Sequence, residues 1–144
     1  MALTVAPAPL ADSFASIVQA DAFHGSRGNE GWAALAETRK EQLLRQGTDY
    51  MTGTYGRRWV DGVGNLETDD VPPALANACA ILALRAKDKP LAPDMGPAVV
   101  RKKVDVLEIQ YAEGAKQTVT FTEVDNMLAQ YLRGFSINIP LVRV

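Results

Sequence analysis

The stretch from Val71 to Lys89 constrains the fold of this chain more than any other segment. It begins close to two prolines, whose preset φ angle and missing N–H suit the first turn of a helix. It ends with basic residues before Pro90, where cations favour the helix dipole and proline blocks continuation. Between these ends only Asn77 and Arg85 are clearly polar. The pattern predicts a helix that other elements surround on nearly every side.

The overall composition excludes several classes of protein. With 144 residues, of which 47% are hydrophobic and 22% charged, we expect one soluble domain with a substantial core. The net charge of −2 argues against a protein whose main partner is a polyanion, although it allows a local basic patch. The N-terminus lacks the basic region of a signal peptide, and no apolar run approaches the ~20 residues that span a bilayer. We therefore expect synthesis in the cytoplasm.

Two helices are predicted before the central one. A short helix covers residues 16–24, with Ser16 as a good N-cap. A long helix covers roughly 30–51, where apolar residues recur near the 3.6-residue period and Asn29 can act as the cap. Gly47 is a weak point at which this helix could bend.

A β element and a last helix are predicted after the central helix. Residues 99–111 are rich in β-forming side chains, which indicates one strand or a bent pair of short strands. The last helix runs from 122 to 132, opened by Thr122 with Asp125 three residues on as a near capping box. The fold class is therefore mainly α, with four helices and a small β element.

The termini differ from the helical domain, which we place at residues 13–134. Residues 1–12 hold prolines among small residues and predict an extended arm, either disordered or ordered by a neighbour. Residues 135–144 form an extended tail that is too apolar to remain in water. This tail could pair with the strand at 99–111 or add a strand to another subunit. Its apolar residues include Phe135, Ile137, Ile139, Leu141 and Val142.

No catalytic, cofactor-binding or metal-binding pattern is present in the sequence, so we expect no enzyme. The chain has one histidine, His24, at the end of a short helix, where a positively charged imidazole is favoured over a metal ligand. Cys79 is expected to be a small buried residue rather than a reactive thiol. The acidic residues Glu67, Asp69 and Asp70 precede the central helix and are expected to favour its positive end.

Two basic groups are the candidates for partner binding. Arg57 and Arg58 adjoin Trp59, a combination that suits stacking on nucleic acid and equally suits a protein interface. Alternatively, Trp59 fills the core and the two arginines pair with nearby acidic residues. The second group lies in the predicted β element and consists of Arg101, Lys102 and Lys103.

Five short motifs follow one another between residues 16 and 133. They are Ala-Asp-Ala-Phe at 20–23, Tyr-Gly-Arg-Arg-Trp-Val-Asp-Gly at 55–62, Pro-Pro-x-Leu-x-x-Ala-x-Ala at 72–80, Lys-Val-x-x-x-x-Ile-x-Tyr at 103–111 and Val-Asp-x-x-Leu-x-x-Tyr-Leu at 124–132. Their order and spacing resemble those of the head–tail connector adaptor proteins of tailed bacteriophages. The chain departs from that family in its N-terminal arm, in its apolar tail, and at Asp70-Val71, where relatives often carry tryptophan.

The resemblance implies a structural role rather than an enzymatic one. Such adaptors look like four-helix units that form a ring, usually of twelve copies, below the portal protein. The ring extends the channel through which the genomic DNA passes and docks the next tail or stopper protein. The implied location is the virion, and neither a cofactor nor a membrane is implied. Relatives are also described as DnaT-like single-stranded-DNA-binding proteins, an alternative that needs a basic face containing Arg57 and Arg58.

Overall fold

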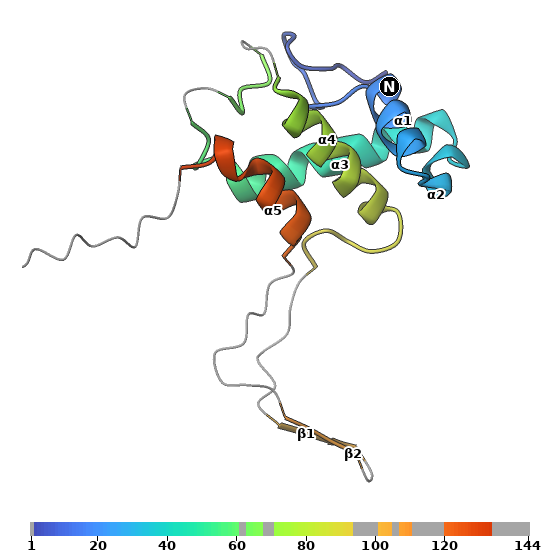
Figure 1. Ribbon diagram of the computed structural model, residues 1–144, viewed down its shortest axis with the longest axis vertical. Helices are drawn as coiled ribbons and strands as arrows, with labels where there is room; N and C mark the ends of the chain where they lie inside the picture. Colours follow the sequence, from blue (N-terminus) through green and yellow to red (C-terminus); the bar gives the residue numbers. More distant parts are fainter. Residues whose placement is uncertain are drawn as a thin grey trace, which may run out of the picture.

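The computed structural model in Figure 1 describes residues 2–60, 63–67, 71–93, 101–104, 107–110 and 120–133. These residues form a mainly helical protein, which confirms the predicted fold class. They contain five α-helices where four were expected, together with one short 3-10 helix and two short strands. The elements are α1 (Ile17–Ser26), α2 (Glu30–Ala33), α3 (Glu37–Tyr55), α4 (Pro73–Ala86), β1 (Arg101–Val104), β2 (Leu107–Gln110), α5 (Thr122–Leu128) and η1 (Ala129–Tyr131).

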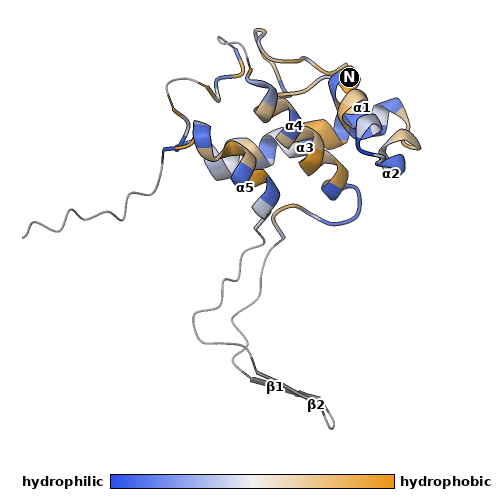
Figure 2. Ribbon diagram, viewed as in Figure 1, coloured by the Kyte–Doolittle hydropathy of each residue, from blue (hydrophilic) through white to orange (hydrophobic). Residues whose placement is uncertain are grey.

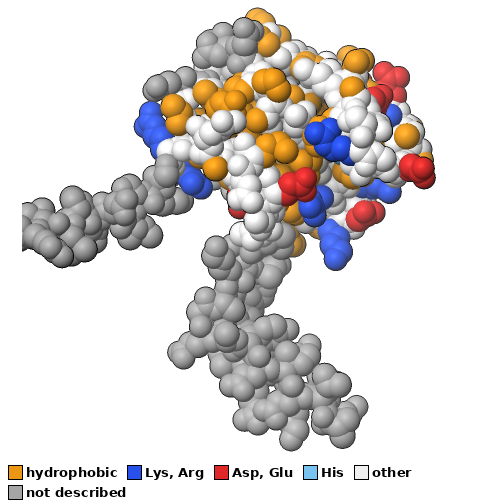
Figure 3. All heavy atoms as spheres, in the orientation of Figure 1, with side chains coloured by type: hydrophobic (Ala, Val, Ile, Leu, Met, Phe, Trp, Pro, Cys, Tyr) orange, Lys and Arg blue, Asp and Glu red, His pale blue; other side chains and the backbone are white. Residues whose placement is uncertain are grey.

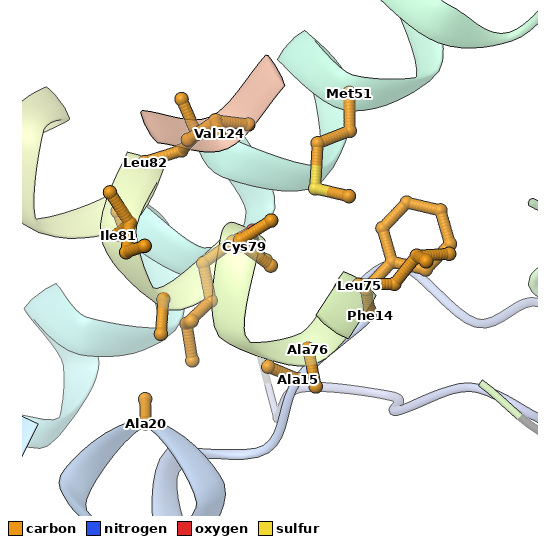
Figure 4. Close-up of a cluster of buried hydrophobic side chains, with 14 of the residues drawn as sticks. Phe14, Ala15, Ala20, Met51, Leu75, Ala76, Cys79, Ile81, Leu82 and Val124 are labelled. Atoms are coloured by element: carbon orange, nitrogen blue, oxygen red, sulfur yellow. Dashed lines mark hydrogen bonds between the residues drawn. The ribbon is translucent and has the colours of Figure 1, made fainter. Parts of the chain in front are cut away.

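Helix α4 is the centre of the core, as its sequence predicts. It begins after Pro72, and nine of its fourteen residues are buried. Figure 2 shows it as a largely hydrophobic ribbon between the other helices. In Figure 4, side chains from α1, α3, α5 and the segment before α1 surround it, among them Ala20, Met51, Val124 and Phe14. Burial on all sides explains why this helix has almost no polar face.

The contact between α3 and α4 is unusually close at Gly47. A Cβ atom on Gly47 would lie 2.9 Å from the carbonyl oxygen of Cys79 and 3.4 Å from the backbone nitrogen of Ala83. The glycine therefore lets the two helix backbones approach, and the expected bend is not its role. Cys79 is fully buried beside Thr48, with 3.3 Å between its Sγ and the threonine Oγ1, and burial raises the pKa of the thiol. This confirms Cys79 as a small buried residue.

The long helix predicted over residues 30–51 is wrong, because the chain breaks between α2 and α3. Ala36 is extended, with φ −66° and ψ 149°, although its neighbours are good helix formers. Tertiary contacts account for the break. The indole Nε1 of Trp32 donates to Asp21 of α1 at 2.7 Å, and Lys40 of α3 binds the same carboxylate oxygen at 2.9 Å. These contacts hold α2 against α1.

His24 is a neutral, buried residue, which corrects the prediction of a charged imidazole at a helix end. It is only 1% exposed, and its Nε2 lies 2.9 Å from the carbonyl oxygen of Ala80. Its Nδ1 lies 3.0 Å from the side-chain nitrogen of Asn29. A carbonyl oxygen only accepts and an amide nitrogen only donates, so the proton sits on Nε2. Burial lowers the pKa of His24. Asn29 precedes α2 as predicted, but its side chain makes no cap hydrogen bond.

The N-terminal arm is ordered by its own chain. The carboxylate of Asp12 accepts the backbone N–H of Thr4 at 2.9 Å and pairs with Arg45 of α3 at 2.7 Å. Arg45 also donates to the carbonyl oxygen of Ala2 at 3.0 Å. The arm is therefore tied to α3, an arrangement that the sequence did not suggest. At the start of α1, Ser16 forms the predicted N-cap by accepting from the Gln19 backbone N–H.

Strands β1 and β2 form an antiparallel pair that matches the predicted pair of short strands. Arg101 lies opposite Gln110, and Val104 lies opposite Leu107. At α5 the predicted capping box is wrong, because Thr122 is the first helical residue and no side chain caps the helix. The predictions for Asp69, Asp70 and the tail at 135–144 fall outside the described residues.

Candidate partner-binding surface

A groove of about 610 Å³ separates the end of α3 from α5. Tyr50 and Tyr55 come from α3, Leu91 from the chain after α4, and Asp125 and Leu132 from the C-terminal helical segment. We call this the α3–α5 groove. Figure 3 shows hydrophobic side chains gathered on one face of the molecule, with Lys and Arg side chains at its left edge. Grooves of this size accommodate a few large apolar side chains.

A hydrogen bond between helices forms the floor of the groove. The hydroxyl of Tyr55, which is 2% exposed, donates to Oδ1 of Asp125 across a separation of seventy residues. Burial raises the pKa of Tyr55, and the bond to Asp125 raises it further, so the phenol keeps its proton. The Tyr50 ring stands edge-on to Tyr55 and to Phe121, with centroid separations of 6.3 and 5.4 Å. This aromatic floor fixes α5 on α3.

Beside the groove, residues 58–60 form a short pairing with residues 131–133. Trp59 and Leu132 form an antiparallel bridge, and Leu132 is extended with φ −107° and ψ 136°. Two backbone hydrogen bonds flank this bridge, from Val60 N–H to Tyr131 O (2.9 Å) and from Arg133 N–H to Arg58 O (2.6 Å). The chain therefore leaves the helical part at Arg133 already extended and attached to the end of α3.

Trp59 packs on the core, which is one of the alternatives left open by the sequence. Its ring lies 6.4 Å from that of Phe14 and 5.9 Å from that of Tyr55. A Cβ on Gly64 would overlap the indole, so the backbone of Gly64 covers one side of it. The indole is therefore occupied by intrachain contacts and only partly accessible.

The structure brings three arginines together beside the groove. Arg57 is exposed, Arg58 is half-buried at the groove, and Arg133 is exposed and bonded through its backbone to Arg58. Asp61, one of the nearby acidic residues with which Arg57 and Arg58 could pair, lies outside the described residues. The sequence gives no signal that Arg133 would join Arg57 and Arg58.

The other predicted residues lie elsewhere. Arg101, Lys102 and Lys103 belong to β1, and in the backbone register they pair with Gln110, Ile109 and Glu108 of β2. Phe135, Ile137, Ile139, Leu141 and Val142 fall outside the described residues. The groove itself was not predicted, because Tyr50, Leu91 and Asp125 are distant in sequence. The only local signal in the sequence is that Tyr50 lies within the apolar periodicity of residues 30–51.

Within the described ranges, no group of three His, Cys, Asp or Glu side chains is arranged to hold a metal ion. No helix in the same ranges is both long enough and apolar enough to cross a membrane. The described residues place an apolar groove next to three arginines.

The described residues form a small, mainly helical protein with an apolar groove. A family model described as "Putative DnaT-like ssDNA binding protein" matches residues 1–144, and the chain belongs to that family. No curated protein and no solved structure matches the chain.

Proposed function

We propose that the chain is a structural adaptor subunit of a tailed bacteriophage, located in the virion neck. Copies of the chain form a ring beneath the portal protein. The resemblance to the adaptor family implies twelve copies. The ring extends the channel for the genomic DNA and docks the next tail or stopper protein. The family resemblance supplies this role, and the layout of the chain around the α3–α5 groove supports it.

The supporting observation is where the chain enters and leaves the helical part. Pro93, the last described residue before the β pair, lines the groove, and so does Thr120, the first described residue after it. Leu132, next to the last described residue, also lines the groove. The segments at 94–119 and 134–144 therefore both start beside one groove. A helical unit with two long segments starting beside one groove suits a subunit that contacts several neighbours.

Imaging tests the proposal directly. The purified chain, mixed with its cognate portal protein and viewed by negative-stain electron microscopy, should add a second ring to the portal ring. Portal rings that remain unchanged at saturating concentrations of the chain would contradict the proposal.

A second candidate function is single-stranded-DNA binding, as the description of the family suggests. The cluster of Arg57, Arg58 and Arg133 is the observation that favours it, because cations that follow a backbone are one part of such sites. The aromatic part is weaker, since Trp59 packs on Phe14 and Tyr55. A gel-shift assay of the isolated chain at low and moderate salt separates the two functions.

A further inference from the structure

Leu10, in the segment before α1, has a position that the fold itself does not explain. Its side chain is 84% exposed, the largest value among the large hydrophobic residues that the structure describes. Its φ angle is 60°, in the left-handed region that L side chains other than Asn and Asp rarely adopt. Neither burial in the core nor backbone preference therefore accounts for a leucine at this position.

Leu10 occupies the third position of a tight turn. The Ala11 N–H donates to the carbonyl oxygen of Ala8 at 3.1 Å, so Pro9 and Leu10 are the two central residues. Proline is favoured at the second position of such turns, but a positive φ at the third position favours glycine or asparagine. A leucine there strains the backbone and exposes apolar surface to water. Burial of its side chain against a partner would offset both penalties.

The loop around this turn is ordered within the chain. The Ala6 N–H donates to the carbonyl oxygen of Ser13 at 2.9 Å, and Asp12 pairs with Arg45 of α3 at 2.7 Å. These contacts fix the base of the loop on the helical part. Little ordering is therefore left to be done when Leu10 meets a partner, which favours binding.

We propose that Leu10 of one copy docks in the α3–α5 groove of a neighbouring copy of this chain. The groove has an apolar floor that includes Leu91 and Leu132, at 8% and 9% exposure. In Figure 1 the loop before α1 and helix α5 lie on opposite sides of α4, so the turn and the groove are different surfaces of one molecule. Contact between two different surfaces joins copies head to tail, and a ring can close from such contacts. The contact rests on the proposed ring function and names the surfaces that would join its subunits.

The charges beside the two surfaces are complementary. The carbonyl oxygen of Leu66 accepts the Ala8 N–H at 3.3 Å, so the exposed Glu67 lies next to the loop. Arg57 is exposed beside the groove. When the turn of one copy enters the groove of the next, a carboxylate beside the turn can approach a guanidinium beside the groove. This complementarity favours a second copy as the occupant.

Disulfide trapping between two variants of the full-length chain tests the contact. Ala129 is exposed on the groove wall, and the native Cys79 is fully buried, so it can remain. Leu10→Cys mixed with Ala129→Cys should form a mixed disulfide, both at high protein concentration and with the portal protein present. Val18→Cys mixed with Ala129→Cys is the matched control, because Val18 is 77% exposed on α1, and it should not cross-link. Equal yields for the two mixtures, or no mixed disulfide, would overturn the proposal.

Leu10→Gly separates a binding role from a structural one. Glycine adopts a φ of 60° readily, so this variant should be at least as stable as the native chain in urea denaturation. Loss of the buried side chain should raise the dissociation constant of self-association roughly tenfold to a hundredfold, measured by sedimentation. Glu67→Lys should also weaken association, and its combination with Arg57→Glu should restore it. Unchanged association of Leu10→Gly would overturn the proposal.

Failure of this contact and failure of the adaptor function give different results. A second ring on the portal protein without the mixed disulfide would overturn the contact and leave the adaptor function intact. A mixed disulfide with unchanged portal rings would support the contact and contradict the adaptor function.

Discussion

Gly47 of α3 lies directly against the backbone of Cys79 in α4, since a Cβ atom there would be 2.9 Å from the Cys79 carbonyl oxygen. Alanine is favoured over glycine by ~1 kcal/mol inside a helix, but overpacking of a tight contact costs ~1–3 kcal/mol. We expect Gly47→Ala to reduce the free energy of unfolding by up to ~2 kcal/mol, measured by urea denaturation.

The matched control for this change is on the same helix. A Cβ on Gly53 would meet nothing within 4 Å. Gly53→Ala should therefore show only the helix propensity gain and stabilise the chain by up to ~1 kcal/mol. Equal effects at the two glycines would contradict the close contact between α3 and α4.

Loss of the bond between Tyr55 and Asp125 should weaken the attachment of α5. Tyr55→Phe removes a buried donor to a carboxylate. A bond of this kind contributes about 1.5–3 kcal/mol, so we expect a loss of that order in the free energy of unfolding. Tyr50→Phe is the control, because Tyr50 is only half-buried in the same groove, and it should lose less. A larger loss for Tyr50→Phe would contradict this account.

Stability should fall in mildly acidic solution because of His24. Its pKa is lowered in the folded chain, chiefly by burial, from about 6.5 in the unfolded chain. The unfolded state therefore binds a proton first as the pH falls. The stability that is present above pH ~6.5 is lost progressively until the pH passes the lower, folded pKa. Urea denaturation at a series of pH values between 7.5 and about 5 measures this loss.

His24→Gln provides the comparison for the pH series. It should be less stable at neutral pH, because both ring nitrogens have partners, but its stability should change less between neutral and mildly acidic pH. The depressed pKa of Asp21 acts in a different window, below its ordinary value of 3.8. There, hydrogen bonds from Lys40 and Trp32 outweigh the opposite effect of burial. A pH dependence that the variant retains in full would exclude His24 as its source.

Deletion of residues 135–144 tests the role of the tail in assembly. The described core residues all precede residue 134, so we expect the truncated chain to remain a folded monomer. If the tail drives docking, this monomer should no longer join the portal protein, as judged by co-sedimentation. The exposed substitution Val18→Ser on α1 should assemble normally. If the truncated chain still joins the portal protein, residues 135–144 do not drive docking.

The adaptor function predicts that the isolated chain binds single-stranded DNA weakly. In a gel-shift assay, any complex at low salt should disappear at moderate salt. Tight binding that Arg57→Ser weakens and Arg39→Ser leaves unchanged would favour the DNA-binding function instead. Both arginines are exposed, but they lie at opposite ends of α3 and its extension.

The sequence predicted the elements whose signals are local. The apolar run of α4, the cap at Ser16 and the burial of Cys79 depend on nearby residues, and the structure confirms them. The break at Ala36 could not be predicted, because it results from contacts that Trp32 makes with Asp21 in another helix.

The same limit explains the errors at single residues. His24 was treated as a helix-end cation because its partner, the carbonyl oxygen of Ala80, is 56 residues away. Gly47 was treated as a possible bend because the close approach of α4 depends on residues that are distant in the sequence. The α3–α5 groove joins residues from three parts of the sequence, so the groove had to come from the structure. Arg57 and Arg58, which the sequence analysis selected as candidates for binding, lie beside it.

The pairing of 58–60 with 131–133 has a mechanical consequence. A partner that pulls on the chain beyond Arg133 acts first on two backbone hydrogen bonds, and these are attached to the segment that follows α3. Tension on the tail is therefore shared between α5 and α3 instead of unwinding the short C-terminal helix alone. The bridge at Trp59 and Leu132 therefore protects α5 from force applied at the end of the chain.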